Sequence, residues 1–135
     1  MKYIATTAQS VPAAVATLTA ALAERKFGVL HIHDLHKTLN SKGVPFEPEC
    51  QVLEVCNPQQ AARVLSADID LNMALPCRIS VYSKAGRTNI GMISPKETLR
   101  FLSDSPELAA VADEVESVLI AAIDEAANPV SGSKN

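Results

Sequence analysis

The sequence lacks most of the motifs by which enzymes and nucleotide-binding proteins are recognised. Its 135 residues include no tryptophan, only 4% aromatic residues and only five glycines. Those glycines, at positions 28, 43, 86, 91 and 132, never approach the spacing of a phosphate-binding turn. A serine elbow flanked by glycines, a His-Glu-x-x-His helix and a Cys-x-x-Cys pair are also missing from the sequence. The sequence therefore does not predict glycine-based cofactor binding, and it carries none of the chemistry that those motifs mark.

Long apolar runs and clusters of basic residues are missing as well. The longest apolar run near the end, residues 118–123, covers six residues, whereas a bilayer requires roughly 20. Twelve basic and 15 acidic residues give a net charge of -3, and Arg25-Lys26 is the only adjacent basic pair. Binding to nucleic acid requires several cations that converge on phosphates. We therefore expect neither a membrane span nor a nucleic-acid partner.

Length and cysteine content indicate the domain organisation and the compartment. A chain of 135 residues is near the commonest domain size, so we expect a single α+β domain over residues 1–127 and a flexible polar tail over 128–135. The first ten residues lack the basic and apolar regions of a secretion signal. Three cysteines are an odd number, which fits reduced thiols better than a disulfide framework. These features together predict a cytoplasmic protein.

Hydrophobic periodicity predicts an α+β fold. Strands are expected at residues 2–7, 29–33, 49–55, 77–82 and 88–93, and helices at 12–26, 34–43, 57–66, from 94 and from 105 to 127. Gly28 is expected to close the first helix, and residues 67–75 are expected to form a loop. Lys84-Ala85-Gly86-Arg87 is a hairpin turn, so the sheet of about five strands contains antiparallel pairs. We expect the helices on one side of this sheet.

Alanine is concentrated in the first and last of these helices. Thirteen of the 20 alanines fall there, and the long C-terminal helix carries a wide apolar stripe over residues 108–126. Such small side chains allow close packing against a sheet or against another subunit. We expect a homodimer that uses either this stripe or an exposed sheet edge.

The strand at residues 50–56 carries an unusual set of side chains. Because strand side chains alternate, Cys50, Val52, Glu54 and Cys56 share one face. Cys56 lies at the carboxyl end of the strand beside a helix N-terminus, where backbone donors and the helix dipole lower a thiol pKa. Cys77 begins a later strand and could lie beside Cys56. The alternative is that each free cysteine serves only as a small buried hydrophobe.

Histidine and methionine supply further candidate ligands. His31 and His33 project from one strand face and His36 follows within a helical turn, a spacing that suits a transition metal. The alternative is that these histidines face solvent on a half-buried sheet. Met73 and Met92 are candidate soft ligands to copper or haem iron, or else they fill the core.

Two segments resemble a known family. Residues 50–58, followed by Ala61 and Leu65, and then residues 75–82, are similar to the core of the bacterial and archaeal domain-of-unknown-function family 302, over about residues 5–123. The resemblance implies a small α+β domain with a topology like that of the TATA-binding protein, frequently dimeric and without an accepted reaction. The matching positions are Cys56, Asn57, Pro58, Pro76 and Cys77. Helix capping explains Asn57 and Pro58, and Pro76 orients the start of a strand. The two thiols are left without such an explanation.

Three functional hypotheses follow. The first is a non-catalytic, homodimeric binding domain whose pocket, near Cys56, Cys77 and Glu54, holds a soft metal, a sulfur species or a small ligand. The second is a haem or other redox-centre protein with His, Met or Cys ligands. The third is an enzyme with Cys56 as nucleophile, for which Glu54 and His33 are the only candidate general bases.

Overall fold

An antiparallel sheet of five strands organises residues 1–129, which are the residues that the computed structural model describes. The strands lie in the order β1-β5-β4-β3-β2, and every neighbouring pair runs antiparallel. Their bounds are β1 Lys2–Thr7, β2 Gly28–Asp34, β3 Cys50–Cys56, β4 Cys77–Lys84 and β5 Arg87–Ile93. The hairpin between β4 and β5 turns at Ala85 and Gly86, which both have positive φ. The predicted α+β class and antiparallel sheet are confirmed.

Helices fill the remaining segments in the predicted order. Their bounds are α1 Val11–Glu24, α2 Leu35–Ser41, α3 Pro58–Ala67, α4 Pro95–Leu102 and α5 Pro106–Ala127. The segment predicted as a loop, residues 67–75, instead contains a 3-10 helix, η1, at Ile69–Ala74. Asp68 begins this short helix because its carboxylate accepts a hydrogen bond from the Asp70 N–H at 3.0 Å.

Serine or asparagine followed by proline marks the start of most helices. In α3 the side-chain oxygen of Asn57 accepts hydrogen bonds from the N–H groups of Gln59 and Gln60, at 3.0 and 3.1 Å. Ser94 and Ser105 cap α4 and α5 in the same way, and each is followed by a proline in the first turn. These local capping bonds explain why the helix starts could be predicted from the sequence.

The end of α1 differs from the prediction. Lys26, not a glycine, adopts the left-handed conformation with φ at +65°, while Gly28 belongs to β2. The N–H groups of Lys26 and Phe27 donate to the carbonyls of Ala23 and Leu22, at 3.0 and 2.9 Å. These two hydrogen bonds close the helix and direct the Phe27 side chain into the core, where it is buried. Burial of the Phe27 ring outweighs the cost of a positive φ at lysine.

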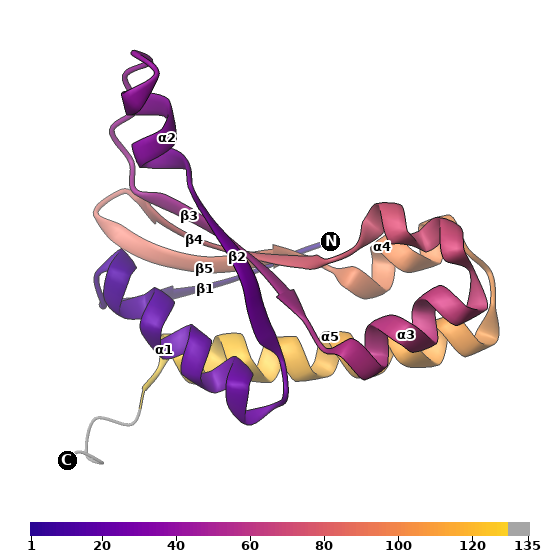
Figure 1. Ribbon diagram of the computed structural model, residues 1–135. Helices are drawn as coiled ribbons and strands as arrows, with labels where there is room; N and C mark the ends of the chain where they lie inside the picture. Colours follow the sequence, from indigo (N-terminus) through magenta and orange to yellow (C-terminus); the bar gives the residue numbers. More distant parts are fainter. Residues whose placement is uncertain (130–135) are drawn as a thin grey trace.

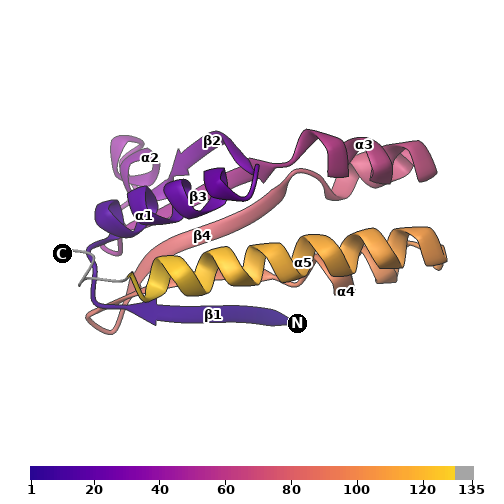
Figure 2. The ribbon, with the colours of Figure 1, turned by 90° about the horizontal axis from the view of Figure 1, so that it is seen from below.

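One face of the sheet is covered by α1 and α5. The two helices lie side by side across it (Figure 2), and the residues that face inward are fully buried. They include Leu18, Leu22, Leu119 and Ile123, each of which contributes about 1.5–3 kcal/mol by burial. Ala14, Ala21, Ala122 and Ala126 are also buried, so the small side chains bring the two helices close together. The apolar stripe of residues 108–126 packs against other parts of the same chain. Of the two surfaces predicted to form a dimer interface, only a sheet edge is therefore still available.

The opposite face of the sheet is open. In Figure 1, α1 and α5 lie together on one side of the strands, and α2 stands away from them beyond the end of β2. Within residues 1–129 no helix combines the length and apolar character that a membrane span requires. The predicted tail begins at Asn128, and its residues 130–135 lie outside the described residues.

Candidate ligand-binding cleft

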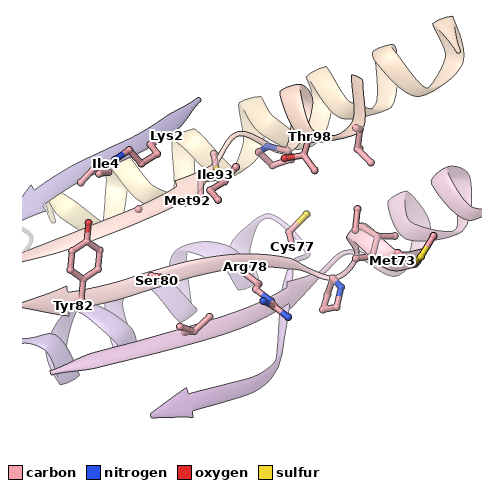
Figure 3. A pocket seen from close by; sticks show the side chains of 17 residues that line it. Lys2, Ile4, Met73, Cys77, Arg78, Ser80, Tyr82, Met92, Ile93 and Thr98 are labelled. Carbon is pink, nitrogen blue, oxygen red and sulfur yellow. The ribbon is translucent and has the colours of Figure 1, made fainter. Parts of the chain in front are cut away.

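The sheet divides into two halves at one end. β4 stays paired with β3 as far as Cys77, and β5 stays paired with β1 as far as Ile93. The pairing between β4 and β5, however, ends at Ser80 and Gly91. Figure 3 shows the two halves diverging beyond this point. We call the space between residues 77–79 of β4 and 92–93 of β5 the split.

The register shows which backbone groups face the split. The Ser83 N–H donates to Glu49 at 2.9 Å, so the odd-numbered residues of β4 direct their backbone groups toward β3. The Ser94 N–H donates to Met1 at 2.6 Å, so the even-numbered residues at that end of β5 direct theirs toward β1. Arg78 and Ile93 therefore turn their N–H and C=O groups toward one another. The Arg78–Ile93 pair that would continue the β4–β5 ladder is missing.

A cleft of about 600 Å³ lies over the split. It extends from the open face of the sheet, at Tyr82 and Ser80, to the ends of the strands, where Leu75 and Leu99 approach from the segments next to η1 and in α4. Cys77 and Met92 lie between these two ends. The volume is within the range of about 300–1,000 Å³ typical of small-molecule sites.

The lining of the cleft is apolar with two cations. The apolar side chains come from every element around the cleft: Ile4, Val52, Met73, Leu75, Met92, Ile93 and Leu99. Lys2 and Arg78 bring positive charge, and none of the lining residues is an aspartate or a glutamate. Among the described residues neither Lys2 nor Arg78 forms an ion pair within 4.0 Å. Glu54 is the strand partner of Arg78 and lies just outside this lining, so the cleft itself holds two cations, with one carboxylate next to Arg78.

Cys77 lies in this cleft as the sequence led us to expect. It belongs to the helix-covered face of β4, with Ile79 and Val81, and packs against the core. Burial raises the pKa of the Cys77 thiol to about 11, and a charge on nearby Cys56 acts in the same direction. At neutral pH the Cys77 side chain is therefore a protonated thiol, a poor nucleophile.

Cys56 does not share this site. Its neighbour Val55 is the residue paired with Cys77, so the alternation of β3 places Cys56 on the other face, with Glu54. Cys56 is not among the residues that line the cleft, and all three cysteines are free. Cys50 lies at the far end of β3, opposite Tyr82, and burial raises the pKa of its thiol. Of the two thiols that were expected to share a pocket, Cys77 lines the cleft and Cys56 lies outside its lining.

Two of the three histidines lie beside the cleft on the open face of the sheet. The rings of His31 and His33 meet edge to face with centroids 4.4 Å apart, and His33 Nε2 lies 2.8 Å from Glu54 Oε2. The hydrogen bond from His33, with the positive charge of Arg78 as a smaller cause, lowers the pKa of Glu54. His36 is held elsewhere, because its Nδ1 lies 3.0 Å from the Pro48 carbonyl oxygen.

The predicted metal and haem ligands come together only in part. Across residues 1–129 no group of three or more His, Cys, Asp or Glu side chains is placed to hold a metal ion. Met73 and Met92 do line the cleft, with Met73 81% exposed at its outer end and Met92 buried, but His31 and His33 do not. The cleft therefore gathers Met and Cys side chains, without the histidines.

Sequence reasoning missed the two cations of the cleft. Arg78 could be assigned to the polar face of its strand from the alternation with Ser80 and Tyr82. The position of Lys2 could not be predicted in this way, because it depends on the pairing of β1 with β5, which brings residue 2 beside residue 93.

Comparison with known proteins agrees with this architecture. The family described as "Domain of unknown function DUF302" matches residues 3–126. A solved structure titled "Crystal structure of uncharacterized conserved protein DUF302 from Bacillus stearothermophilus" is 33% identical, with a TM-score of 0.89, and the match covers 93% of this chain and 97% of that one. No curated protein matches this sequence. Because the family match spans nearly the whole chain and the related structure shares its fold, the protein belongs to the DUF302 family.

Proposed function

We propose that the protein is a non-catalytic binding protein for a small organic anion with an apolar body. The observation that carries the proposal is the lining of the 600 Å³ cleft: apolar side chains, two cations and no carboxylate. An apolar site with a few placed polar groups is the usual form of a small-molecule site. The two cations select a negative group, and the apolar wall supplies most of the affinity.

Arg78 and Lys2 occupy suitable positions for the anionic group. Arg78 extends from β4 and Lys2 from β1, on the two sides of the split (Figure 3). Lys2 is the strand partner of Ile93, so one cation belongs to the missing Arg78–Ile93 pair and the other lies next to it. An arginine guanidinium binds a carboxylate through two parallel hydrogen bonds, and a lysine ammonium adds a compact charge.

The other hypotheses find less support in this geometry. A cysteine enzyme requires a base within hydrogen-bond reach of its nucleophile, and no hydrogen bond among residues 1–129 joins Cys56 to His33 or Glu54. A soft metal or a sulfur species in the cleft would meet a single thiol, that of Cys77, and in the described part of the chain no group of three or more His, Cys, Asp or Glu side chains is placed to hold a metal ion. A haem ligand set of His and Met would need His31 or His33 in the cleft, where neither lies.

We extend the proposal to assembly and location. The protein is a homodimer that pairs through a sheet edge, and β1 is the better edge because β2 is interrupted by a register shift between Val29 and His31. The location is the cytoplasm, in keeping with three free cysteines.

Isothermal titration with octanoate, octanol and octylammonium tests the ligand class. These probes share one alkyl chain and differ in the charge of the head group. Octanoate is expected to bind most tightly, and Arg78→Gln or Lys2→Gln is expected to weaken it by about tenfold, the value of one charge-assisted hydrogen bond. Lys84→Gln is the matched control, since Lys84 lies on the same strand as Arg78 but outside the cleft. Equal affinity for the three probes, or no saturable binding of octanoate, would overturn the proposal.

A further inference from the structure

The split in the sheet carries an inference that rests on the proposed function and specifies its ligand. The missing Arg78–Ile93 pair leaves one N–H and one C=O on each side of the split without the strand partner that continuation of the ladder would supply. Backbone groups of this kind are satisfied in native proteins by another polar group or by water. A ligand in the cleft is placed to make these bonds.

The unpaired groups are backbone N–H donors and C=O acceptors, which another amide can complement. A carboxylate accepts hydrogen bonds and can satisfy only the two N–H groups. An amide both donates and accepts, and so can meet an N–H on one strand and a C=O on the other. Extended peptides bind to open sheet edges through the same two kinds of bond. The split therefore fits a ligand with at least one secondary amide.

Charge and apolarity place the rest of this ligand. Arg78 is itself one of the two residues of the missing pair, and Lys2 is the strand partner of the other, Ile93. A carboxylate close to the amide would lie between these cations. On the other side the cleft continues to Leu75 and Leu99, where an acyl chain would be covered.

We propose that the cleft binds an N-acylated amino acid, with its amide in the Arg78–Ile93 gap, its carboxylate between Arg78 and Lys2, and its acyl chain toward Leu75 and Leu99. Recognition by strand backbone distinguishes this ligand from a simple fatty acid of the same charge and length.

The decisive comparison is between N-octanoylglycine and its ester isostere, octanoyloxyacetate. The two share charge, length and shape, and only the first has the N–H donor. One hydrogen bond lost in a desolvated site corresponds to roughly a three- to tenfold weaker affinity for the ester, measured by isothermal titration. The second readout is the backbone carbonyl ¹³C signal of Arg78 or Ile93, which is expected to shift with N-octanoylglycine, whose N–H donates to one of these carbonyls, and to shift less with the ester or with octanoate. The Val81 carbonyl, which lies in paired strand, serves as the internal reference.

Each outcome separates this inference from the proposed function. Equal affinities for amide and ester, with octanoate still bound, would overturn amide recognition and leave the binding of organic anions intact. Octanoate bound more tightly than N-octanoylglycine would have the same meaning. Failure of all three anions to bind would overturn both proposals.

Discussion

Ser80 of β4 and Gly91 of β5 form the last pair that joins the two halves of the sheet. Gly91 is also the strand partner of Ile4, whose Cγ1 lies 3.0 Å from the position that a Cβ on residue 91 would occupy. The Tyr3 carbonyl oxygen is 3.2 Å from the same position. A glycine is therefore required where the split begins, because Ile4 folds over it to line the cleft.

Replacement of Gly91 tests this relationship. Gly91→Ala is expected to push Ile4 away and to lower the free energy of unfolding by about 1–3 kcal/mol, the usual cost of overpacking. Urea denaturation measures the loss. Gly28→Ala is the matched control, since Gly28 also lies in a strand but a Cβ there meets nothing within 4 Å. The control is expected to be neutral or to stabilise by up to about 1 kcal/mol. Equal behaviour of the two variants would show that the close contact at Gly91 is unimportant.

The parts of the fold that could be predicted are those that depend on neighbouring residues. The helix starts at Asn57, Ser94 and Ser105 depend on capping hydrogen bonds within three residues, and the hairpin depends on the two adjacent turn residues 85 and 86. The end of α1 could not be predicted in the same way. Lys26 takes a conformation that glycine favours because the burial of Phe27 compensates for it, which is a tertiary effect.

The site was predicted less well, for a physical reason. Cys77 lines the cleft, but Cys56 was expected beside it, since the two thiols lie at the same end of neighbouring strands, and Cys56 is not part of the lining. Which face each side chain takes depends on the register between β3 and β4, where a shift of one residue reverses every side chain. The split itself depends on where the pairing of β4 and β5 ends, and no local pattern of residues encodes that point.

Cys77 predicts a loss of stability at alkaline pH. Its pKa is about 11 in the folded protein and 9.0 ordinarily, so the unfolded chain loses the thiol proton first. The stabilisation is complete below pH 9 and is lost as the pH rises toward about 11, by up to roughly 2–3 kcal/mol. Urea denaturation from pH 8 to 11 measures this. In Cys77→Ala the free energy of unfolding is expected to lose the part of its pH dependence that the Cys77 thiol causes. Cys50→Ala, at the other end of the sheet, is expected to keep most of this pH dependence. A wild-type profile identical to that of Cys77→Ala would contradict the prediction.

Glu54 predicts a loss of stability at acid pH. The hydrogen bond from His33 lowers the pKa of the carboxyl below its ordinary value of 4.5. The folded state is therefore favoured above that value, and the advantage disappears as the pH falls through the lowered pKa. Denaturation between pH 3 and 6 is expected to show a smaller acid dependence for Glu54→Gln than for the wild type. Glu49→Gln is a control outside this hydrogen bond, and the same change in both variants would show that the His33–Glu54 pair has no specific role.

The proposed dimer makes a prediction about one backbone N–H. Because Met1 accepts the hydrogen bond from Ser94, the odd-numbered residues of β1 face β5 and the even-numbered ones face outward. Thr6 thus presents its N–H at the free edge, where a second copy of β1 would pair with it in a twofold dimer. Sedimentation at micromolar concentration is expected to give a mass near twice 14.3 kDa for the wild type.

Thr6→Pro removes that outward N–H without removing a bond to β5, so it is expected to convert the dimer to a monomer while the far-UV circular dichroism stays unchanged. Thr6→Val is the control. It also loses the hydrogen bond from Thr6 Oγ1 to Asn89 Oδ1, but it keeps the N–H and should remain dimeric. A wild-type monomer would refute the dimer. A Thr6→Pro dimer would instead show that the subunits meet elsewhere than at the β1 edge, which leaves the edge of β2 and the open face of the sheet as the surfaces to test.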